Sequence, residues 1–327
     1  MKLQILIPHY KEPLATIRPL LDSIALQQNV DFGEIGVVIC HDGDESPSFD
    51  SLVEYPFLIE QIRQDHRGVS AARNSCLDAA TADYVMFCDA DDMFYNACGL
   101  WIVFREINNG GFDSLASIFI EETRIPNTNE VTYINREMDS TFVHGKVHRR
   151  QYLIDNGIRW KESLTIHEDS FFNIQAQNLS KNVKYCSTPF YLWKWRDDSV
   201  CRHDPKYILK TYKNMIDSND ALIDEFVKRG VQDKAMFYVA FMIFDAYYTM
   251  NKPEWVNQEN KEYRASTERR FADYYKKRKT IWVSIPQTDK MVISNQVRSR
   301  SVMEGMMMEA VTIDDWLRHI VRVSKKR

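Results

Sequence analysis

The sequence lacks long hydrophobic runs and an overall positive charge. No segment approaches the roughly 18 consecutive apolar residues that a membrane-spanning helix needs. The apolar run within residues 1–8 is too short for the hydrophobic region of a secretion signal, and no small-residue cleavage site follows it. The formal net charge of −4 provides no global field for sequence-independent nucleic-acid binding. We therefore expect a folded cytoplasmic protein that is not integral to a membrane.

Paired cysteines and a glycine-rich phosphate loop are also missing. The cysteines show no C-x-x-C spacing, and Cys40 and Cys88 lie in apolar runs typical of buried strands. We expect them to be reduced, inert thiols. No glycine-rich loop follows the first apolar run, which excludes the dinucleotide-binding fingerprint and the P-loop.

Short apolar runs alternate with helical patterns through the first third of the chain. This alternation predicts an α/β fold in which helices pack on the faces of a parallel sheet. Strands are expected at residues 3–7, 35–40, 57–62 and 84–88, and helices at 14–24, 69–80 and 100–108. Strand-like patterns at 114–120, 131–135 and 140–144 indicate the second half of the same domain.

After about residue 205 the pattern changes to long helical segments, including an apolar one at 237–248 and a charged one at 257–279. We therefore expect two parts, residues 1–205 and a mainly helical region at 206–327. Lys276 to Lys279 and the tail 325–327 are basic and could contact an anionic polymer or a lipid surface, although such runs are more typical of solvated helix ends. The helical region is a candidate homo-oligomer interface or acceptor platform.

Acidic residues follow the fourth predicted strand. Asp89 and Asp91 are two residues apart, and like charges so close raise each other's pKa unless a cation lies between them. Mg²⁺ and Mn²⁺ prefer carboxylate ligands together with phosphate oxygens. A solvated acidic turn is the alternative. Because ligands bind beyond the carboxyl ends of parallel strands, this position favours a metal site.

Other polar clusters are predicted at the same edge of the sheet. Tyr10 after the first strand could stack on a nucleobase, and Asp42 after the second could accept from a ring N–H, although Asp42-Gly43 alone is typical of a turn. Arg67 and Arg73 precede the fourth strand and suit a diphosphate. For Arg73, an ion pair on a helix surface is nearly as well supported.

Further along the chain, Glu168-Asp169 precede an apolar helical run. Asp169 could be a helix N-cap, or a general base for an acceptor hydroxyl with Glu168 orienting the acceptor. The aromatic and basic segment at 190–196 suits sugar stacking or a phosphate clamp, although its tryptophans are more often core residues. His203 follows, and a lone histidine is more often a surface residue.

Taken in order, these segments resemble family 2 glycosyltransferases of the GT-A fold, over about the first 205 residues. The family opening, a strand followed by Pro-x-Tyr-Asn-x-Glu, appears as Ile7-Pro8-His9-Tyr10-Lys11-Glu12. The other matching motifs are Asp-Asp-Gly-Ser at 41–44, Gly-x-Ser-x-Ala-Arg-Asn at 68–74, Asp-x-Asp at 89–91, Gly-Lys-hydrophobic-x-Arg-Arg at 145–150, Glu-Asp at 168–169, and a flexible phosphate-side loop at 199–203. The chain departs from these motifs at Lys11, His41 and Asp44.

The resemblance implies a Rossmann-like mixed sheet and inverting transfer of a sugar from a nucleotide-sugar, with UDP as the expected nucleotide. It implies donor-binding roles for Pro8, Tyr10, Glu12, Asp42, Arg67, Arg73, Asp89 and Ala90, metal-binding roles for Asp91, Asp89 and His203 with Mn²⁺ or Mg²⁺, and catalytic roles for Asp169 as base and Glu168 beside it.

The acceptor stays open at this point. A surface glycan or other polymer, a lipid-linked intermediate, a protein or a modified DNA base would each be compatible, as would action at the inner membrane surface. The competing functions are a sugar nucleotidyltransferase, which would carry a glycine-rich loop in place of residues 8–13, and an inactive binding protein, from which the acids would be lost.

Overall fold

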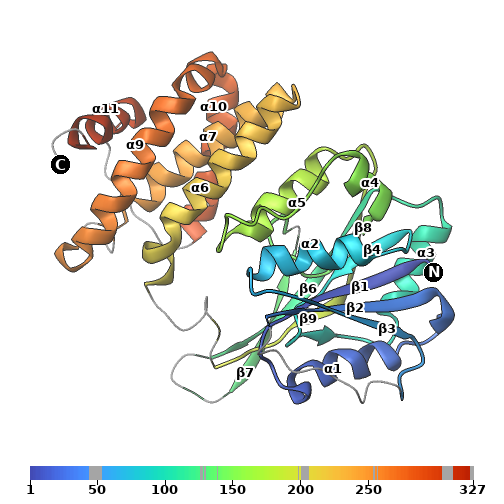
Figure 1. Ribbon diagram of the computed structural model, residues 1–327. Coiled ribbons are helices and arrows are strands. Elements are labelled where there is room, and N and C mark those ends of the chain that lie inside the picture. The colour runs from blue at the N-terminus through green and yellow to red at the C-terminus, as the bar shows by residue number, and fades with distance from the viewer. Residues whose placement is uncertain are drawn as a thin grey trace. The chain divides into compact units, whose positions relative to one another are not determined.

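Nine strands form one mixed sheet in the computed structural model of the protein (Figure 1). The strands are β1 (Leu3–His9), β2 (Ile35–Asp42), β3 (Leu58–Gln64), β4 (Tyr84–Phe87), β5 (Met93–Phe94), β6 (Ser114–Arg124), β7 (Val131–Arg136), β8 (Lys146–Arg149) and β9 (Val183–Trp193). The structure describes residues 1–43, 54–125, 128, 130–137, 139–197, 199, 206–252, 255, 257–303 and 312–324.

The first four strands are parallel, and the rest of the sheet is mixed. The strand order is β3-β2-β1-β4-β8-β6-β9-β5, with β7 paired to the free part of β6. β8 runs antiparallel to both β4 and β6, whereas β6 and β9 are parallel. Because β2 and β3 extend the sheet on one side of β1 while β4 lies on the other, the chain reverses its direction of growth between β1 and β4.

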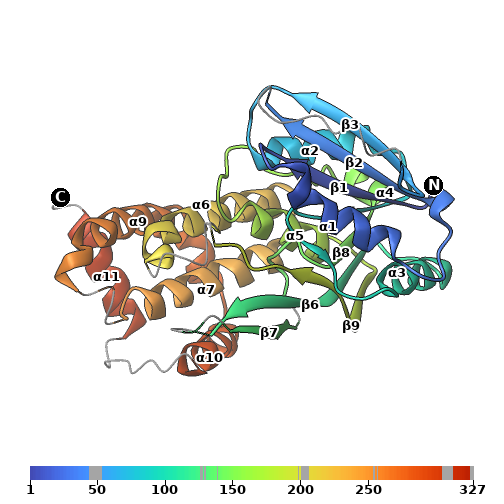
Figure 2. The ribbon, with the colours of Figure 1, turned by 90° about the horizontal axis from the view of Figure 1, so that it is seen from below.

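Helices cover both faces of the sheet (Figures 1 and 2). Those of this part of the chain are α1 (Leu14–Ala25), α2 (Val69–Ala79), α3 (Gly99–Asn108), α4 (Arg150–Asp155) and α5 (Glu168–Asn178), with a short 3₁₀ helix η1 (Phe32–Glu34).

The two faces of the sheet have separate hydrophobic cores. Leu3, Ile5 and Ile7 pack with α1 and α3, whereas Leu6 points the other way and packs with α2, α4 and α5. Successive residues of a strand face opposite sides, so a strand covered on both sides is apolar throughout. This three-layer arrangement confirms the predicted α/β class.

The predicted strand at residues 140–144 was wrong. The Asp139 carboxylate accepts hydrogen bonds from the backbone N–H groups of Thr141 and Phe142, which turns the chain before it can extend. Pairing with β4 and β6 starts only at Lys146, after Gly145. Val143 and His144 are both buried, as they would be in a central strand, but a side-chain turn determined the backbone.

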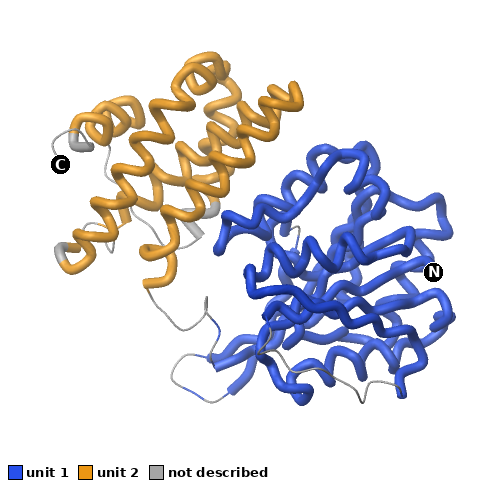
Figure 3. Tube along the Cα trace, in the orientation of Figure 1, with its two compact units in different colours: residues 1–199 blue, residues 200–327 orange. Residues whose placement is uncertain are grey.

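The chain forms two compact units, Met1–Ser199 and Val200–Arg327 (Figure 3). The predicted boundary at residue 205 lies outside the described residues. The second unit contains α6 (Tyr207–Lys228), α7 (Gln232–Thr249), η3 (Gln258–Asn260), α9 (Lys261–Ser284), α10 (Gln287–Met303) and α11 (Ile313–Ser324). No described helix has the length and apolar character needed to cross a membrane.

Part of the basic run in α9 is not a solvated helix end. Arg278 is 4% exposed and donates to the carboxylates of Asp220 and Asp224 on α6. Lys277 pairs with the same two acids. These two cations therefore hold α9 to α6, and the buried Arg278 is not available to an anionic polymer.

Gly145 provides a test of this packing. Its φ is +65°, and a Cβ built on it would lie 2.4 Å from Ser117 Oγ. Gly157 has φ +55° but no atom within 4 Å of such a Cβ. We expect Gly157→Ala to cost about 1–2 kcal/mol of unfolding free energy for the backbone conformation alone. Gly145→Ala should cost about 1–3 kcal/mol more because of the overlap.

Chemical denaturation of both variants measures the difference. Equal losses of stability in the two alanine variants would show that Ser117 moves aside freely and that the close approach at Gly145 is unimportant.

Candidate active site

The carboxyl ends of the neighbouring parallel strands β2, β1 and β4 lie at one edge of the sheet. Asp42 ends β2, Tyr10 follows β1 and Asp89 follows β4. The change of direction between β1 and β4 is a topological switch point, where open α/β sheets bind their ligands. The sequence indicated the edge but not the strand order that creates this crevice.

On the β1 side, an aromatic surface is exposed. The Tyr10 side chain is 40% exposed and its ring stacks on that of His66, with centroids 4.2 Å apart. The Glu12 carboxylate accepts from the Tyr10 backbone N–H at 2.7 Å, which holds the turn after β1. Pro8 lies within β1, paired in register with Cys40.

Asp42 organises the loop before α2. One carboxylate oxygen accepts from the Arg67 N–H at 2.9 Å and the other from the Gly68 N–H at 2.8 Å. His66 Nδ1 lies 2.9 Å from the same carboxylate, and Asp42 is only 2% exposed. The Arg67 side chain points elsewhere, to Glu162 at 2.5 Å. Asp42 therefore fixes the position of the loop that brings His66 beside Tyr10.

Arg73 lies at the centre of the acidic groups. Its guanidinium donates to Asp89 Oδ1 at 2.8 Å, to Asp169 Oδ1 at 2.7 Å and to Glu168 Oε1 at 3.1 Å. It also stacks over the Trp160 ring at 4.3 Å. Arg73 is 3% exposed, so the alternative of an ion pair on a helix surface was wrong.

The charges around Arg73 act on each other strongly. Burial opposes the charged form of Arg73, but the carboxylates of Asp169, Asp89 and Glu168 raise its pKa above the usual range. For Asp89, burial is likewise opposed by the Arg73 charge, which leaves the pKa of this carboxyl below its ordinary value. Arg73 and Asp89 are therefore both ionised at neutral pH.

Asp91 faces a second arginine. Its Oδ2 lies 2.9 Å from Nη1 of Arg196, which follows β9. Burial and the neighbouring Asp89 raise the pKa of Asp91, against the lowering effect of Arg196. Ala90, between the two acids, is 5% exposed and its side chain belongs to the hydrophobic core, so it can offer a ligand only its backbone.

Asp92 lies deeper. It is 1% exposed and accepts from the Tyr191 hydroxyl at 2.6 Å and the Lys194 N–H at 3.0 Å. His144 Nδ1 lies 3.5 Å from Asp92, is buried and has no hydrogen-bond partner among the described residues. Burial lowers the pKa of His144 to about 3, so its ring is neutral and Nδ1 can present a lone pair.

A divalent metal fits these groups. Ligand atoms of Asp89, Asp92 and His144 all lie within 4.8 Å of one another. A neutral imidazole and carboxylate oxygens form a donor set suited to a divalent metal ion. His203, predicted as a ligand, lies outside the described residues.

Glu168 and Asp169 begin α5. The N-cap of this helix is His167, in the left-handed conformation, so the alternative that Asp169 is the N-cap was wrong. Asp169 accepts from Arg73 through one oxygen and from the Val143 N–H at 3.3 Å through the other. Burial, opposed by Arg73, raises the pKa of Asp169 to about 7. A carboxylate with this pKa is suited to accept a proton at neutral pH.

Sequence reasoning missed the roles of His144, Asp92 and Tyr191. His144 comes from a segment taken for an ordinary strand, and only tertiary structure brings it to Asp92. The position of His144 directly before the Gly-Lys motif at residues 145–150 was the one signal available.

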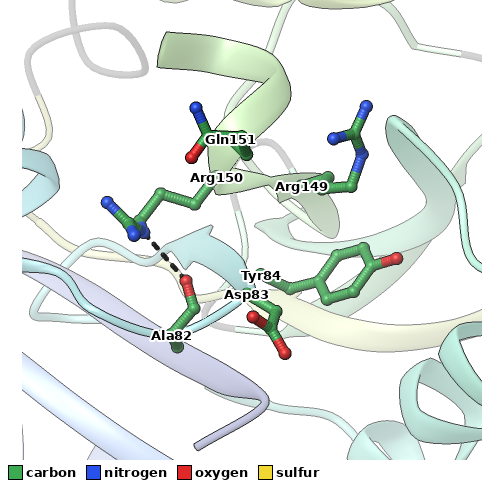
Figure 4. Close-up of a pocket in the computed structure, with 6 residues that line it drawn as sticks. All are labelled: Ala82, Asp83, Tyr84, Arg149, Arg150 and Gln151. Atoms are coloured by element: carbon green, nitrogen blue, oxygen red, sulfur yellow. Dashed lines mark hydrogen bonds between the residues drawn. The ribbon is translucent and has the colours of Figure 1, made fainter. Parts of the chain in front are cut away.

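A separate pocket of about 390 Å³ lies at the other end of β4 (Figure 4). It is lined by Ala82, Asp83, Tyr84, Arg149, Arg150 and Gln151. Arg149 pairs with Asp113, and Arg150 donates to the Ala82 carbonyl. Both cations therefore have protein partners, and the pocket is remote from the acids that follow β4.

Comparison with known proteins agrees with the fold and with the acids that follow β4. Residues 4–145 match the family model for glycosyl transferase family 2. The chain is 22% identical to EpsH of Bacillus subtilis over 231 residues, which are 64% of this chain and 65% of EpsH. It is 25% identical to the poly(ribitol-phosphate) beta-N-acetylglucosaminyltransferase TarS of Staphylococcus aureus over 211 residues, 59% of this chain but only 35% of TarS.

Solved structures show the same fold. Residues 1–349 of S. aureus TarS in complex with UDP superpose with a TM-score of 0.63 at 16% identity, covering 100% of this chain and 92% of that one. The mannosyltransferase PcManGT of Pyrobaculum calidifontis, in complex with GDP-Man and Mn²⁺, gives a TM-score of 0.51 at 11% identity, covering 99% and 86%. The matched family model shows that residues 4–145 carry a glycosyl transferase family 2 domain, with its acids gathered beyond β4, and the superposed structures show that the fold is of the GT-A type.

Proposed function

We propose that the protein transfers a sugar from a UDP-sugar to an acceptor hydroxyl with inversion at the anomeric carbon. The observation that carries this proposal is the position of Arg73, which hydrogen-bonds both Asp89 and Asp169. One guanidinium thus holds an acid suited to the leaving diphosphate and its metal beside an acid suited to the acceptor. A single displacement needs both groups near the same carbon atom.

The crevice between β1 and β4 supports a nucleotide donor. Tyr10 and His66 offer aromatic faces for a base, and the Asp42 loop ends at Gly68, the residue before the N-terminus of α2. A helix N-terminus favours phosphate. The complex of TarS with UDP supports UDP as the donor nucleotide. The chain departs from the family motifs at Lys11 and His41, which are the sequence neighbours of Tyr10 and Asp42.

The acids after β4 support a divalent ion, Mn²⁺ or Mg²⁺. Asp89 belongs both to the predicted pair with Asp91 and to the buried cluster with Asp92 and His144. When bound, such an ion would neutralise the charge that develops on the leaving diphosphate. Arg196, paired with Asp91, places a further positive charge on that side of the crevice.

Asp169 supports the proton-transfer step. Its carboxylate would accept the proton of the acceptor hydroxyl while the hydroxyl oxygen bonds to the anomeric carbon and the bond from that carbon to the diphosphate oxygen breaks. The UDP anion leaves with the electron pair, and Asp169 keeps the proton. Glu168 shares the Arg73 guanidinium and would orient the acceptor.

The acceptor we propose is a hydroxyl on a surface glycan or similar polymer. TarS, named for a poly(ribitol-phosphate) acceptor, supports this class. A sugar nucleotidyltransferase is the competing activity, and the two are separated by product. Release of UDP from UDP-sugars with Mn²⁺ supports the transferase, whereas release of pyrophosphate from UTP and a sugar 1-phosphate would support the rival. An inactive binding protein would yield neither product.

Removal of Asp91 tests the metal. We expect Asp91→Ala to abolish Mn²⁺-stimulated UDP release, with the protein still folded by circular dichroism. Asp83→Ala, at the opposite end of the same strand, is the matched control and should keep the activity. Wild-type rates in the presence of EDTA would contradict a metal role.

If His144→Ala raises the Mn²⁺ concentration for half-activation while Asp91→Ala does not, the ion lies in the buried cluster.

Replacement of Asp169 tests the base. Asp169→Asn should bind UDP normally but lose turnover by about 10²–10⁴-fold, the usual contribution of a positioned base. Asp155→Asn, an exposed acid at the end of α4, is the control. A variant Asp169→Asn with normal turnover would show that another group is the base.

The pH profile of the wild-type enzyme provides an independent check. A base must be ionised to act, and the pKa of Asp169 is raised to about 7. We therefore expect kcat/KM to rise about tenfold per pH unit below pH 7 and to level off above it. A profile that is already flat at pH 5 would mean that Asp169 is fully ionised there and would contradict this assignment.

A further inference from the structure

Lys146 is a buried cation to which the proposed function assigns no role. It begins β8, within the segment 145–150 that resembles a family motif, and it is 1% exposed. Taking an ammonium group out of water is costly unless nearby groups compensate. A methionine of similar shape would fill the same space without that cost, so a charge at this position needs a specific explanation.

Among the described residues, the side chain of Lys146 makes its polar contacts in the loop before it. Its Nζ donates to the Phe142 carbonyl and lies 4.0 Å from Asp139 Oδ1. Burial lowers the pKa of Lys146 to about 8, while the carboxylates of Asp139 and Asp169 act to raise it. The side chain is therefore mainly protonated at neutral pH and is oriented towards the loop.

The loop from Asp139 to Phe142 is held from more than one side. Asp139 Oδ1 accepts from the N–H of Thr141 at 2.6 Å and from the N–H of Phe142 at 2.8 Å. Asn173, on α5, donates to the Thr141 carbonyl at 3.0 Å. With Lys146 bound to the next carbonyl along, the peptide groups of this turn have fixed directions.

The peptide that follows reaches the proposed base. The peptide unit between Phe142 and Val143 contains the Phe142 carbonyl, which Lys146 binds, and the Val143 N–H, which donates to Asp169 Oδ2 at 3.3 Å. Because a peptide unit is planar, fixing its carbonyl also fixes its N–H. The second oxygen of Asp169 is held by Arg73.

We propose that Lys146 is a positioning residue for Asp169: by holding the Phe142 carbonyl, it directs the Val143 N–H at the carboxylate and so keeps the other oxygen towards Arg73 and the acceptor. This inference rests on the proposed function, in which Asp169 is the base. Lys146 itself touches no reacting atom, and its effect passes through a single peptide group.

Lys146→Met is the principal test. A misplaced base slows the chemical step but not donor binding, and small misplacements cost up to about 10²-fold in rate. We expect kcat for UDP release from a UDP-sugar with Mn²⁺ to fall by about tenfold or more, while the Kd of UDP, measured by calorimetry, stays within about twofold of wild type. Lys146→Arg keeps the charge and should restore part of the lost turnover.

The acid limb of the pH profile, where kcat/KM rises with pH below about pH 7, is a second readout. A merely structural role of Lys146 would not shift this limb. Arg73, Glu168 and Asp89 are the charged groups that face Asp169, and the substitution leaves all three in place. Loss of the Val143 hydrogen bond and of the nearby cation disfavours the carboxylate, so the acid limb should move to higher pH in Lys146→Met.

Two further variants complete the test. Lys184→Met is the matched control, because Lys184 also donates to backbone carbonyls and pairs with Glu106, but on β9. It should change stability without changing kcat or the acid limb. Asp139→Ala removes the acceptor of the turn and leaves Lys146 intact, so it should reproduce the loss of kcat. Asp139→Ala also tests the positioning role if Lys146→Met does not fold.

Folded Lys146→Met with wild-type kcat and acid limb, or Asp139→Ala with wild-type kcat, would overturn the positioning role. Asp169→Asn assayed in parallel separates this failure from a failure of the proposed function. If Asp169→Asn is inactive while Lys146→Met is normal, only the role of Lys146 falls. If Asp169→Asn turns over normally, Asp169 is not the base and both fall.

Discussion

A buried guanidinium surrounded by carboxylates is the interaction on which the rest of the site depends. Arg73 binds Asp89, Glu168 and Asp169, which come from the end of β4 and the first turn of α5. Without a cation, the repulsion between these acids would push the two segments apart or force the acids to take up protons. Arg73 is itself fixed by stacking on Trp160 and by the packing of α2 on β1 and β2. The position of one helix therefore sets the spacing of the acids to which we assign metal binding and proton transfer.

Burial then gives chemically equal side chains different roles. The pKa of Asp89 is lowered because Arg73 outweighs its desolvation, whereas the pKa of Asp169 is raised because desolvation outweighs the same arginine. The pKa of the buried Asp92 is also raised, because burial and then the neighbouring acids Asp91 and Asp89 disfavour its charged form. In many enzymes, different environments move the pKa values of neighbouring acids apart, so that one acid stays ionised and the other transfers a proton. The loop held by Lys146 belongs to this same environment, since it supplies the Val143 N–H to Asp169.

Much of the fold followed from local pattern. The apolar run of β1 and the helical repeat of α1 are short-range signals, and both elements were predicted to within two residues at each end. The segment at 140–144 failed because the Asp139 carboxylate competes with strand formation for the backbone N–H groups, and hydropathy does not register such competition. Arg73 was ambiguous for a similar reason. A charged residue in a helix has the same sequence signature whether it faces water or three partly buried acids.

The sequence by itself determined the class of fold, the order of the motifs and the identity of the acids that follow β4 and begin α5. These depend on residue type and on spacing along the chain, which are local properties. Tertiary structure decided which of these groups meet: that Arg73 joins Asp89 to Asp169, that Arg196 faces Asp91, and that His144 reaches Asp92. Each of these contacts joins residues far apart in the chain through the strand order and helix packing, and each owes its strength to a burial that only the folded chain creates.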